Sequence, residues 1–105
     1  MGPLPVTSGS FTTADGTLLI TFSGSGFSNS VAGLIGMNIA IDGVISGHIS
    51  EIYANNTLTH MAIILKTWVR TGLAAGPHII TLSTVPGTVT DFNDRFNVSV
   101  TEFPF

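Results

Sequence analysis

The three histidines, His48, His60 and His78, are the side chains best suited to proton or metal chemistry near neutral pH. Their spacing matches no metal-binding motif of the His-x-x-x-His kind. His78 follows Pro77 at the start of an expected strand, so we expect a structural role in which a ring nitrogen bonds to a backbone carbonyl. If His60 lay at a three-fold axis, three copies of it could meet around a metal or an anion. The sequence by itself predicts no metal site.

Asp91, Asn93 and Asp94 bring three oxygen-bearing side chains together. Hard cations take carboxylate and amide oxygens, but neither the spacing nor the residues that follow match the calcium loop of a helix–loop–helix protein. We therefore expect these side chains to shape a turn through hydrogen bonds to the backbone. An exposed ion pair between Asp94 and Arg95 would add little stability.

No combination of nucleophile, base and acid in the sequence indicates catalysis. There is no Gly-x-Ser-x-Gly motif before an expected helix, and Gly24-Ser25-Gly26 lacks the helix that follows a phosphate-binding loop. Nothing predicts that Glu51 and Glu102 meet as a glycosidase pair. The chain has no cysteine, which excludes disulfides, thiolate chemistry and zinc–sulfur sites. We expect a protein that is not an enzyme and needs no cofactor.

Tyr53 and Trp68 are the candidates for stacking against a sugar ring, because the C–H faces of a sugar suit an aromatic surface. Glu51, Asn55 and Asn56 lie close to Tyr53 in the sequence and would supply hydrogen bonds to hydroxyl groups. Lone aromatic side chains more often lie in a core or an interface. A carbohydrate-binding site is therefore one alternative for these five residues, and a place in the core or in an interface is the other.

The composition predicts one domain that covers part of its surface with another molecule. The 105 residues leave room for a single core. Hydrophobic residues make up 44% of the chain and charged residues only 9%, against about 25% charged in a typical soluble domain. Large exposed apolar patches mark contact sites, so we expect an oligomer. Three basic residues are too few to bind a row of phosphates, which makes nucleic acid an unsuitable partner.

The N-terminal residues 1–5 read as an extended arm or a cloning remnant. They lack the basic region and the long apolar run of a signal peptide. No apolar segment approaches the roughly 20 residues that cross a bilayer, so we expect no membrane insertion. An extracellular, cell-surface or virion location is expected, reached by a leader outside this sequence or by another route.

Dense β-branched residues and closely spaced turn signals predict an all-β, antiparallel sandwich or barrel without helices. Asp42-Gly43 is a two-residue turn of type I′ between strands at 37–41 and 44–49. The expected pairs across this hairpin are Ile41 with Val44, Ile39 with Ser46 and Met37 with His48. The other expected strands are residues 6–13, 17–23, 57–70, 78–84 and 95–103, with a loop at 24–30 and a turn at Asn55-Asn56.

The expected strand at 57–70 is apolar on both faces. A strand with one face in water would be polar on that face. We therefore expect one face to meet the core and the other to meet a neighbouring subunit, with burial under a loop as the alternative. The core face would carry Met61, Ile63, Leu65 and Val69. The expected subunit interface is Leu58, His60, Ala62, Ile64 and Trp68.

The order of short strands, with GLAAGPHIITL at 72–82 and DFNDRFNVSVTEF at 91–103, resembles the trimeric jelly-roll modules of the tumour-necrosis-factor (TNF) and complement C1q type. The similarity is closest to small bacterial and phage versions at the tip of a stalk or tail fibre, and it covers residues 7–103. This chain is shorter than most animal members and has no collagen-like Gly-X-Y run. The resemblance implies a jelly-roll β-sandwich, one domain over residues 1–105, assembled as a homotrimer.

Two functions follow from the residues and the resemblance together. The first is a non-enzymatic, trimeric structural or display module at the tip of a fibre, a stalk or a particle surface, with other copies of the chain as its partners. The alternative is a small carbohydrate-binding lectin with shallow sites near the subunit edges and a surface glycan as its ligand.

Overall fold

The computed structural model describes residues 3–29 and 33–105, and every regular element in these ranges is a β-strand. Strands make up 65% of the described residues, and all of the sheet pairs are antiparallel. The predicted all-β, antiparallel class is therefore confirmed. Within the described ranges there is also no helix with the length and hydropathy needed to cross a bilayer. Residues 1 and 2 of the expected arm and residue 30 of the expected loop lie outside the description.

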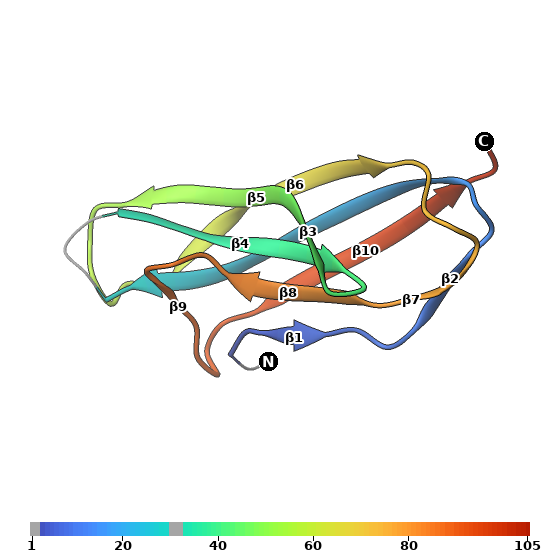
Figure 1. Cartoon of the computed structure of the whole chain (residues 1–105). Coiled ribbons are helices and arrows are strands. Elements are labelled where there is room, and N and C mark those ends of the chain that lie inside the picture. Colours follow the sequence, from blue (N-terminus) through green and yellow to red (C-terminus); the bar gives the residue numbers. More distant parts are fainter. Residues whose placement is uncertain (1–2, 30–32) are drawn as a thin grey trace.

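Two main sheets form an elongated, sandwich-like body of 45 × 21 × 18 Å (Figure 1). The first sheet has the order β1 (Val6–Thr7), β8 (Ile80–Thr84), β4 (Gly33–Ile41) and β5 (Val44–Ala54). The second has the order β10 (Phe96–Phe103), β3 (Thr17–Ser28) and β6 (Met61–Arg70), and β9 (Thr88–Val89) pairs with the far end of β3. A small ribbon of β2 (Phe11–Thr13) and β7 (Gly76–His78) completes the described strands.

The core lies between the two sheets and is built by alternation along the strands. Successive side chains of a strand point to opposite faces, and β3 shows this as a regular alternation of buried and half-buried residues from Thr17 to Phe22. β4 supplies the facing layer from the other sheet. The core side chains are Leu18, Ile20, Phe22, Ile35, Met37, Ile39, Ile41, Ala54, Ile63, Trp68, Leu73, Ile80, Leu82 and Phe96.

β3 continues to Ser28, so the loop expected from Gly24 onward is wrong over residues 24–28. The backbone there pairs with β6, β9 and β10. Gly24 is needed because a Cβ at this position would lie 2.3 Å from Met37 Cε and 3.2 Å from Phe96 Cβ. The glycines therefore mark close packing within a strand, not a break in it.

The Asp42-Gly43 hairpin is confirmed, but its expected register holds only next to the turn. Asp42 and Gly43 have φ angles of 52° and 81°, as a type I′ turn requires, and Ile41 pairs with Val44. A register shift between Asn38 and Ala40 then moves the pairing. Met37 pairs with Ser50, not His48, and the Ser46 hydroxyl donates to the Ile39 carbonyl at 3.0 Å.

β6 begins at Met61, not at residue 57, and an irregularity in it reverses the expected faces. Lys66 pairs with Phe22, but Ile63 pairs with Gly24, so β6 contains one more residue than β3 in this interval. Such a bulge changes which side chains face the core. Ile63 and Trp68 are buried, whereas Ile64, Leu65 and Val69 are exposed. The expected division of this strand into two faces is therefore wrong beyond the bulge.

Two other expected strands are each divided between different sheets. The segment 6–13 contains β1 and β2, and the segment 78–84 contains the last residue of β7 and the whole of β8, with Ile79 between them. Residues 96–103 form β10, as predicted to within one residue.

Candidate functional site

Four of the five predicted ligand-binding residues lie near one another along the chain, and the fifth is elsewhere. Glu51 and Tyr53 alternate with the core-facing residues of β5 and lie on its outer face, where Tyr53 is 60% exposed. Asn55 and Asn56 are exposed in the loop that follows. Trp68 is only 8% exposed and belongs to the core cluster. It is therefore not available for stacking with a ligand on that outer face.

The five predicted interface residues do not all lie on one surface either. Leu58, Ala62 and Ile64 are exposed, so they are available to a partner. Trp68 does not share their face, because the bulge turns it inward. His60 is also exposed overall, but its ring is engaged in a polar cluster within the chain.

This polar cluster joins three segments at the end of the sandwich where β3 ends and β6 begins. His60 comes from the β5–β6 loop, Asp91 and Asp94 come from the turn before β10, and Ser25 comes from β3. The His60 Nδ1 atom lies 2.7 Å from Asp94 Oδ1, and Nε2 lies 3.6 Å from Asp91 Oδ2. One ring nitrogen of His60 and one carboxylate oxygen each of Asp91 and Asp94 all lie within 4.8 Å of one another.

The turn that carries Asp91 and Asp94 is held by its own side chains, as the sequence predicts. Asp91 Oδ1 accepts from the Asn93 N–H at 2.8 Å, and Asp94 Oδ2 accepts from the Asp91 N–H at 2.8 Å. Asp94 Oδ1 also accepts from the Ser25 hydroxyl at 2.7 Å. The Asp94 side chain is 0% exposed and its ionic partner is His60. The expected exposed ion pair with Arg95 is therefore wrong.

The His60 ring is also positioned from its other side. The ring of Phe27 packs against it with a centroid distance of 4.6 Å and a tilt of 52°. The loop before His60 is tied to β3, because the Leu58 N–H donates to the Ser28 carbonyl at 2.8 Å. Both contacts come from the part of β3 that lies beyond Gly24, so the extension of this strand supports the cluster.

The electrostatics of the cluster favour an ionised pair. Burial raises the pKa of Asp94 and is the largest single effect on it, but the hydrogen bonds from His60, the Asp91 N–H and Ser25 together lower that pKa below its usual value. The hydrogen bond to Asp94 raises the pKa of His60 above its usual value, against a smaller opposing effect of desolvation. The protonated imidazole and the ionised carboxylate thus stabilise each other.

A second histidine–aspartate pair lies towards the other end of the molecule. His78 Nδ1 is 2.6 Å from Asp42 Oδ2, and His78 Nε2 is 2.7 Å from the Ala74 carbonyl oxygen. The bond to the backbone carbonyl confirms the structural role expected for His78. Both ring nitrogens face acceptors, and only an imidazolium donates from both. The hydrogen bond to Asp42, with that to Ala74, accordingly raises the pKa of His78.

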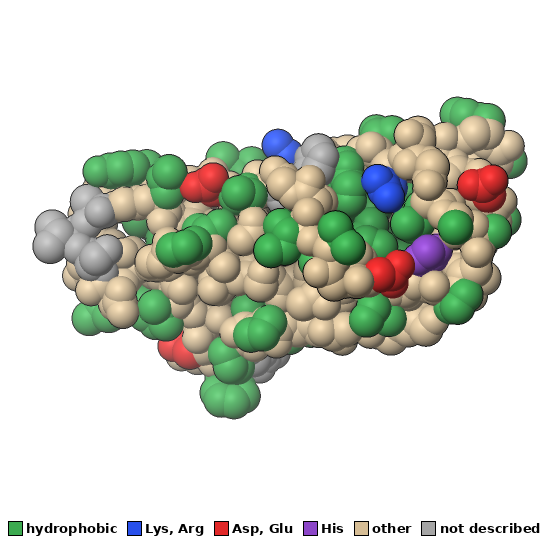
Figure 2. Space-filling model, in the orientation of Figure 1, with side chains coloured by type: hydrophobic (Ala, Val, Ile, Leu, Met, Phe, Trp, Pro, Cys, Tyr) green, Lys and Arg blue, Asp and Glu red, His purple; other side chains and the backbone are tan. Residues whose placement is uncertain are grey.

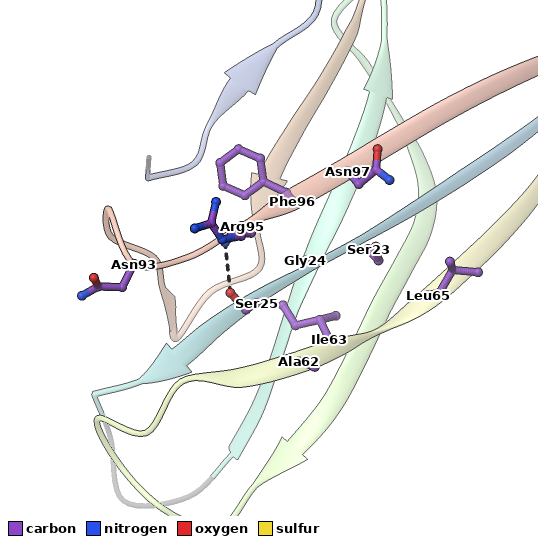
Figure 3. A pocket seen from close by; sticks show the side chains of 10 residues that line it. All are labelled: Ser23, Gly24, Ser25, Ala62, Ile63, Leu65, Asn93, Arg95, Phe96 and Asn97. Carbon is purple, nitrogen blue, oxygen red and sulfur yellow. Dashed lines mark hydrogen bonds between the residues drawn. The ribbon is translucent and has the colours of Figure 1, made fainter. Parts of the chain in front are cut away.

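A shallow depression of about 770 Å³ adjoins the first cluster on the outer face of the second sheet. Figure 3 shows its lining from β3, β6 and the start of β10. Ser23, Asn93, Arg95 and Asn97 contribute polar groups, but most of the lining is apolar and comes from residues such as Ala62, Ile63, Leu65 and Phe96. Such a surface can hydrogen-bond a polar molecule. In the described part of the chain, His60 makes no hydrogen bond to a hydroxyl group that it could activate as a base.

The association of His60 with Asp94 has no signal in the sequence. The two residues are 34 positions apart and belong to no common motif. The sequence identifies each segment as polar, but only the folding of β3 beyond Gly24 brings them to one place.

Comparisons with known proteins identify no relative: no family model, no curated protein and no solved structure matches this chain.

Proposed function

We propose that this chain is a non-enzymatic structural or display module that associates with copies of itself at the surface of a cell, fibre or particle. In its specific form the proposal is a TNF/C1q-like jelly-roll homotrimer, as the resemblance of the sequence implies. The contact would be made by the β5–β6 side, which we define by its exposed apolar residues. These are Val44, Ile45, Ile49, Tyr53, Ile64, Leu65 and Val69.

The observation that carries this proposal is the exposure of these seven side chains along two neighbouring strands. Each is between 36% and 71% exposed. β5 is the last strand of the first sheet and β6 is the last strand of the second, and the Ser50 hydroxyl of β5 donates to the Ile64 carbonyl of β6. The two edge strands therefore lie beside each other. Exposed apolar side chains gathered along neighbouring strands are typical of a site of protein contact.

Two features favour another copy of the chain as the occupant. Sheet edges present unpaired backbone groups, which another strand can pair with, and both strands of the β5–β6 side are edges. The whole surface also has few charges, with three basic and six acidic residues in the chain. Figure 2 shows hydrophobic side chains spread over this view with few charged groups between them. A self-contact covers part of this surface in every copy.

The test is the mass of the protein in solution and its response to Ile64→Glu. Ile64 lies at the bulge of β6 and is 62% exposed, so glutamate is tolerated in a single copy. At an interface the same change removes an apolar contact and buries a charge, which costs about 2–4 kcal/mol and raises the dissociation constant by a factor of about 30–1,000. Light scattering behind a sizing column measures this directly.

The matched control is Phe92→Glu. Phe92 is 79% exposed but lies in the turn before β10, outside the β5–β6 side. A mass of three times 10.9 kDa that Ile64→Glu lowers and Phe92→Glu leaves unchanged is the expected result. A wild-type monomer at micromolar concentration would refute self-association. Equal dissociation by both substitutions would refute the assignment of the β5–β6 side.

The alternative proposal is a small lectin that binds a surface glycan. It is favoured by the exposure of Tyr53 on the same outer face as Glu51, with the exposed Asn55 and Asn56 directly after β5. Tyr53 belongs to the β5–β6 side as well, so its substitution does not separate the two functions. Loss of glycan-array binding in Asn55→Ala and Asn56→Ala, with the mass unchanged, would identify the lectin. An array without signal for the folded wild-type protein would exclude it.

A further inference from the structure

We propose that His60 and Asp91 bind a zinc ion, with the imidazole Nε2 and the Asp91 carboxylate as ligands. Asp94 acts as a positioning residue that holds the imidazole through its other nitrogen. This inference does not depend on self-association, because all three residues belong to one chain.

The spacing of the two ligand atoms fits a shared ion better than a direct contact. His60 Nε2 and Asp91 Oδ2 are 3.6 Å apart, whereas an N–H···O hydrogen bond spans about 2.7–3.2 Å. Zinc binds imidazole nitrogen and carboxylate oxygen at about 2.0–2.2 Å, which places two ligands of a tetrahedral ion about 3.4 Å apart. A zinc ion therefore fits between these atoms with little movement of either side chain.

The imidazole already has the orientation that a ligand needs. Its Nδ1 donates to Asp94 at 2.7 Å, and metal-binding histidines commonly donate their second N–H to a carboxylate in this way. Asp94 is fully buried and is itself fixed by Ser25 and the Asp91 N–H. Phe27 packs against the ring. These contacts direct Nε2 towards Asp91, and a zinc ion that binds there displaces the proton that Nε2 carries in the ionised pair.

Comparison with the His78–Asp42 pair shows why His60, and not His78, is suited to bind a metal. His78 also has its Nδ1 beside a carboxylate, that of Asp42, but its Nε2 is bonded to the Ala74 carbonyl at 2.7 Å. That nitrogen has no lone pair left for a metal. The Nε2 of His60 has a second carboxylate in the corresponding place, at a distance too long for a hydrogen bond.

The donor set selects a transition metal over calcium or magnesium, because those ions take oxygen ligands. Imidazole with carboxylate suits zinc. The side chains of His60 and Asp91 are 36% and 42% exposed, so the remaining coordination positions face solvent. Water, or a donor group of a bound molecule, would complete the coordination.

The experiment is a calorimetric titration of the folded, metal-free protein with Zn²⁺ alone. We expect saturable binding of one ion per chain, which His60→Gln and Asp91→Asn abolish. Asp91→Asn is the more secure variant, because its side chain is half exposed and the fold is easily checked by urea unfolding. His78→Gln is the matched control and should leave binding unchanged. Asp94→Asn, measured where it is folded, should weaken binding about 10- to 100-fold, because the imidazole is no longer held by a carboxylate.

Three results would overturn the assignment. The first is a wild-type protein that takes up no zinc at millimolar concentration. The second is binding by His60→Gln or Asp91→Asn that equals the wild type. The third is displacement of the zinc by an equal concentration of Ca²⁺, which would indicate an oxygen site and not one that includes the His60 imidazole.

Discussion

Replacement of Asp94 by asparagine tests whether the buried carboxylate organises the end of the sandwich. Asp94 Oδ1 accepts from Ser25 and His60, and Oδ2 accepts from the Asp91 N–H. Asparagine has the same shape but only one acceptor oxygen. Whichever way its amide is turned, its NH₂ group faces a donor, and at least one donor loses its acceptor.

The size of the effect follows from these contacts. Hydrogen bonds to a charged group contribute about 1.5–3 kcal/mol, and a buried donor left without a partner costs about 1–3 kcal/mol. We expect Asp94→Asn to lower the free energy of unfolding by about 3 kcal/mol. With a urea m-value of about 1–1.5 kcal/mol/M, the midpoint of unfolding falls by about 2–3 M. The control is Asp15→Asn, which removes the same charge at an exposed turn residue whose φ of 68° asparagine tolerates.

The pH dependence gives a second readout of the same substitution. The pKa of Asp94 is lowered on folding, so its stabilising effect is present above its ordinary value of about 4 and is lost as the pH falls through the folded value. The pKa of His60 is raised by Asp94. The stabilising effect of His60 on the fold is therefore present below about pH 6.5 and is lost as the pH rises through the raised pKa. The difference between wild type and Asp94→Asn should therefore be largest between about pH 4 and 6.5.

The assay is urea unfolding at one protein concentration, at pH values within this range and on both sides of it. A midpoint for Asp94→Asn that matches the Asp15→Asn control at every pH would refute the reasoning. So would a difference between wild type and Asp94→Asn that grows steadily above pH 7.

Two further substitutions test the assignments made for β6 and β4. Trp68→Ala should lower the free energy of unfolding by about 3–5 kcal/mol, because Trp68 is only 8% exposed in the core. A loss of glycan binding, or a lower mass in solution, without a loss of stability would contradict the burial of Trp68. Gly36→Ala should lower the free energy of unfolding by about 1–3 kcal/mol, because a Cβ there would lie 2.5 Å from the Ser50 carbonyl oxygen. The control is Gly33→Ala on the same strand. A Cβ at Gly33 meets nothing within 4 Å, so this substitution should leave thermal unfolding nearly unchanged.

Local chemistry in the sequence was sufficient for the class of the fold and for several of its details. Asp42-Gly43 predicts its own turn, because both residues adopt positive φ readily and the strands on either side alternate. The polar turn before β10 is likewise predicted, since its hydrogen bonds join residues only two or three positions apart. Such features depend on neighbours in the chain and need no knowledge of what packs against them.

Tertiary packing decided the features that determine the candidate sites. The glycines at 24 and 26 read as a loop, but their backbone pairs within the sheet as part of β3, and the close approach of Met37 and Thr88 requires residues without a side chain there. The bulge in β6 turns Trp68 inward and leaves Ile64 outside, which period-2 alternation cannot reveal because one extra residue reverses every face beyond it. His60 and Asp94 meet because β3 continues beyond Gly24 and brings the loop before β6 next to the turn before β10. The sequence thus determined an antiparallel β protein with few charges, whereas long-range packing determined which side chains are exposed and which are paired.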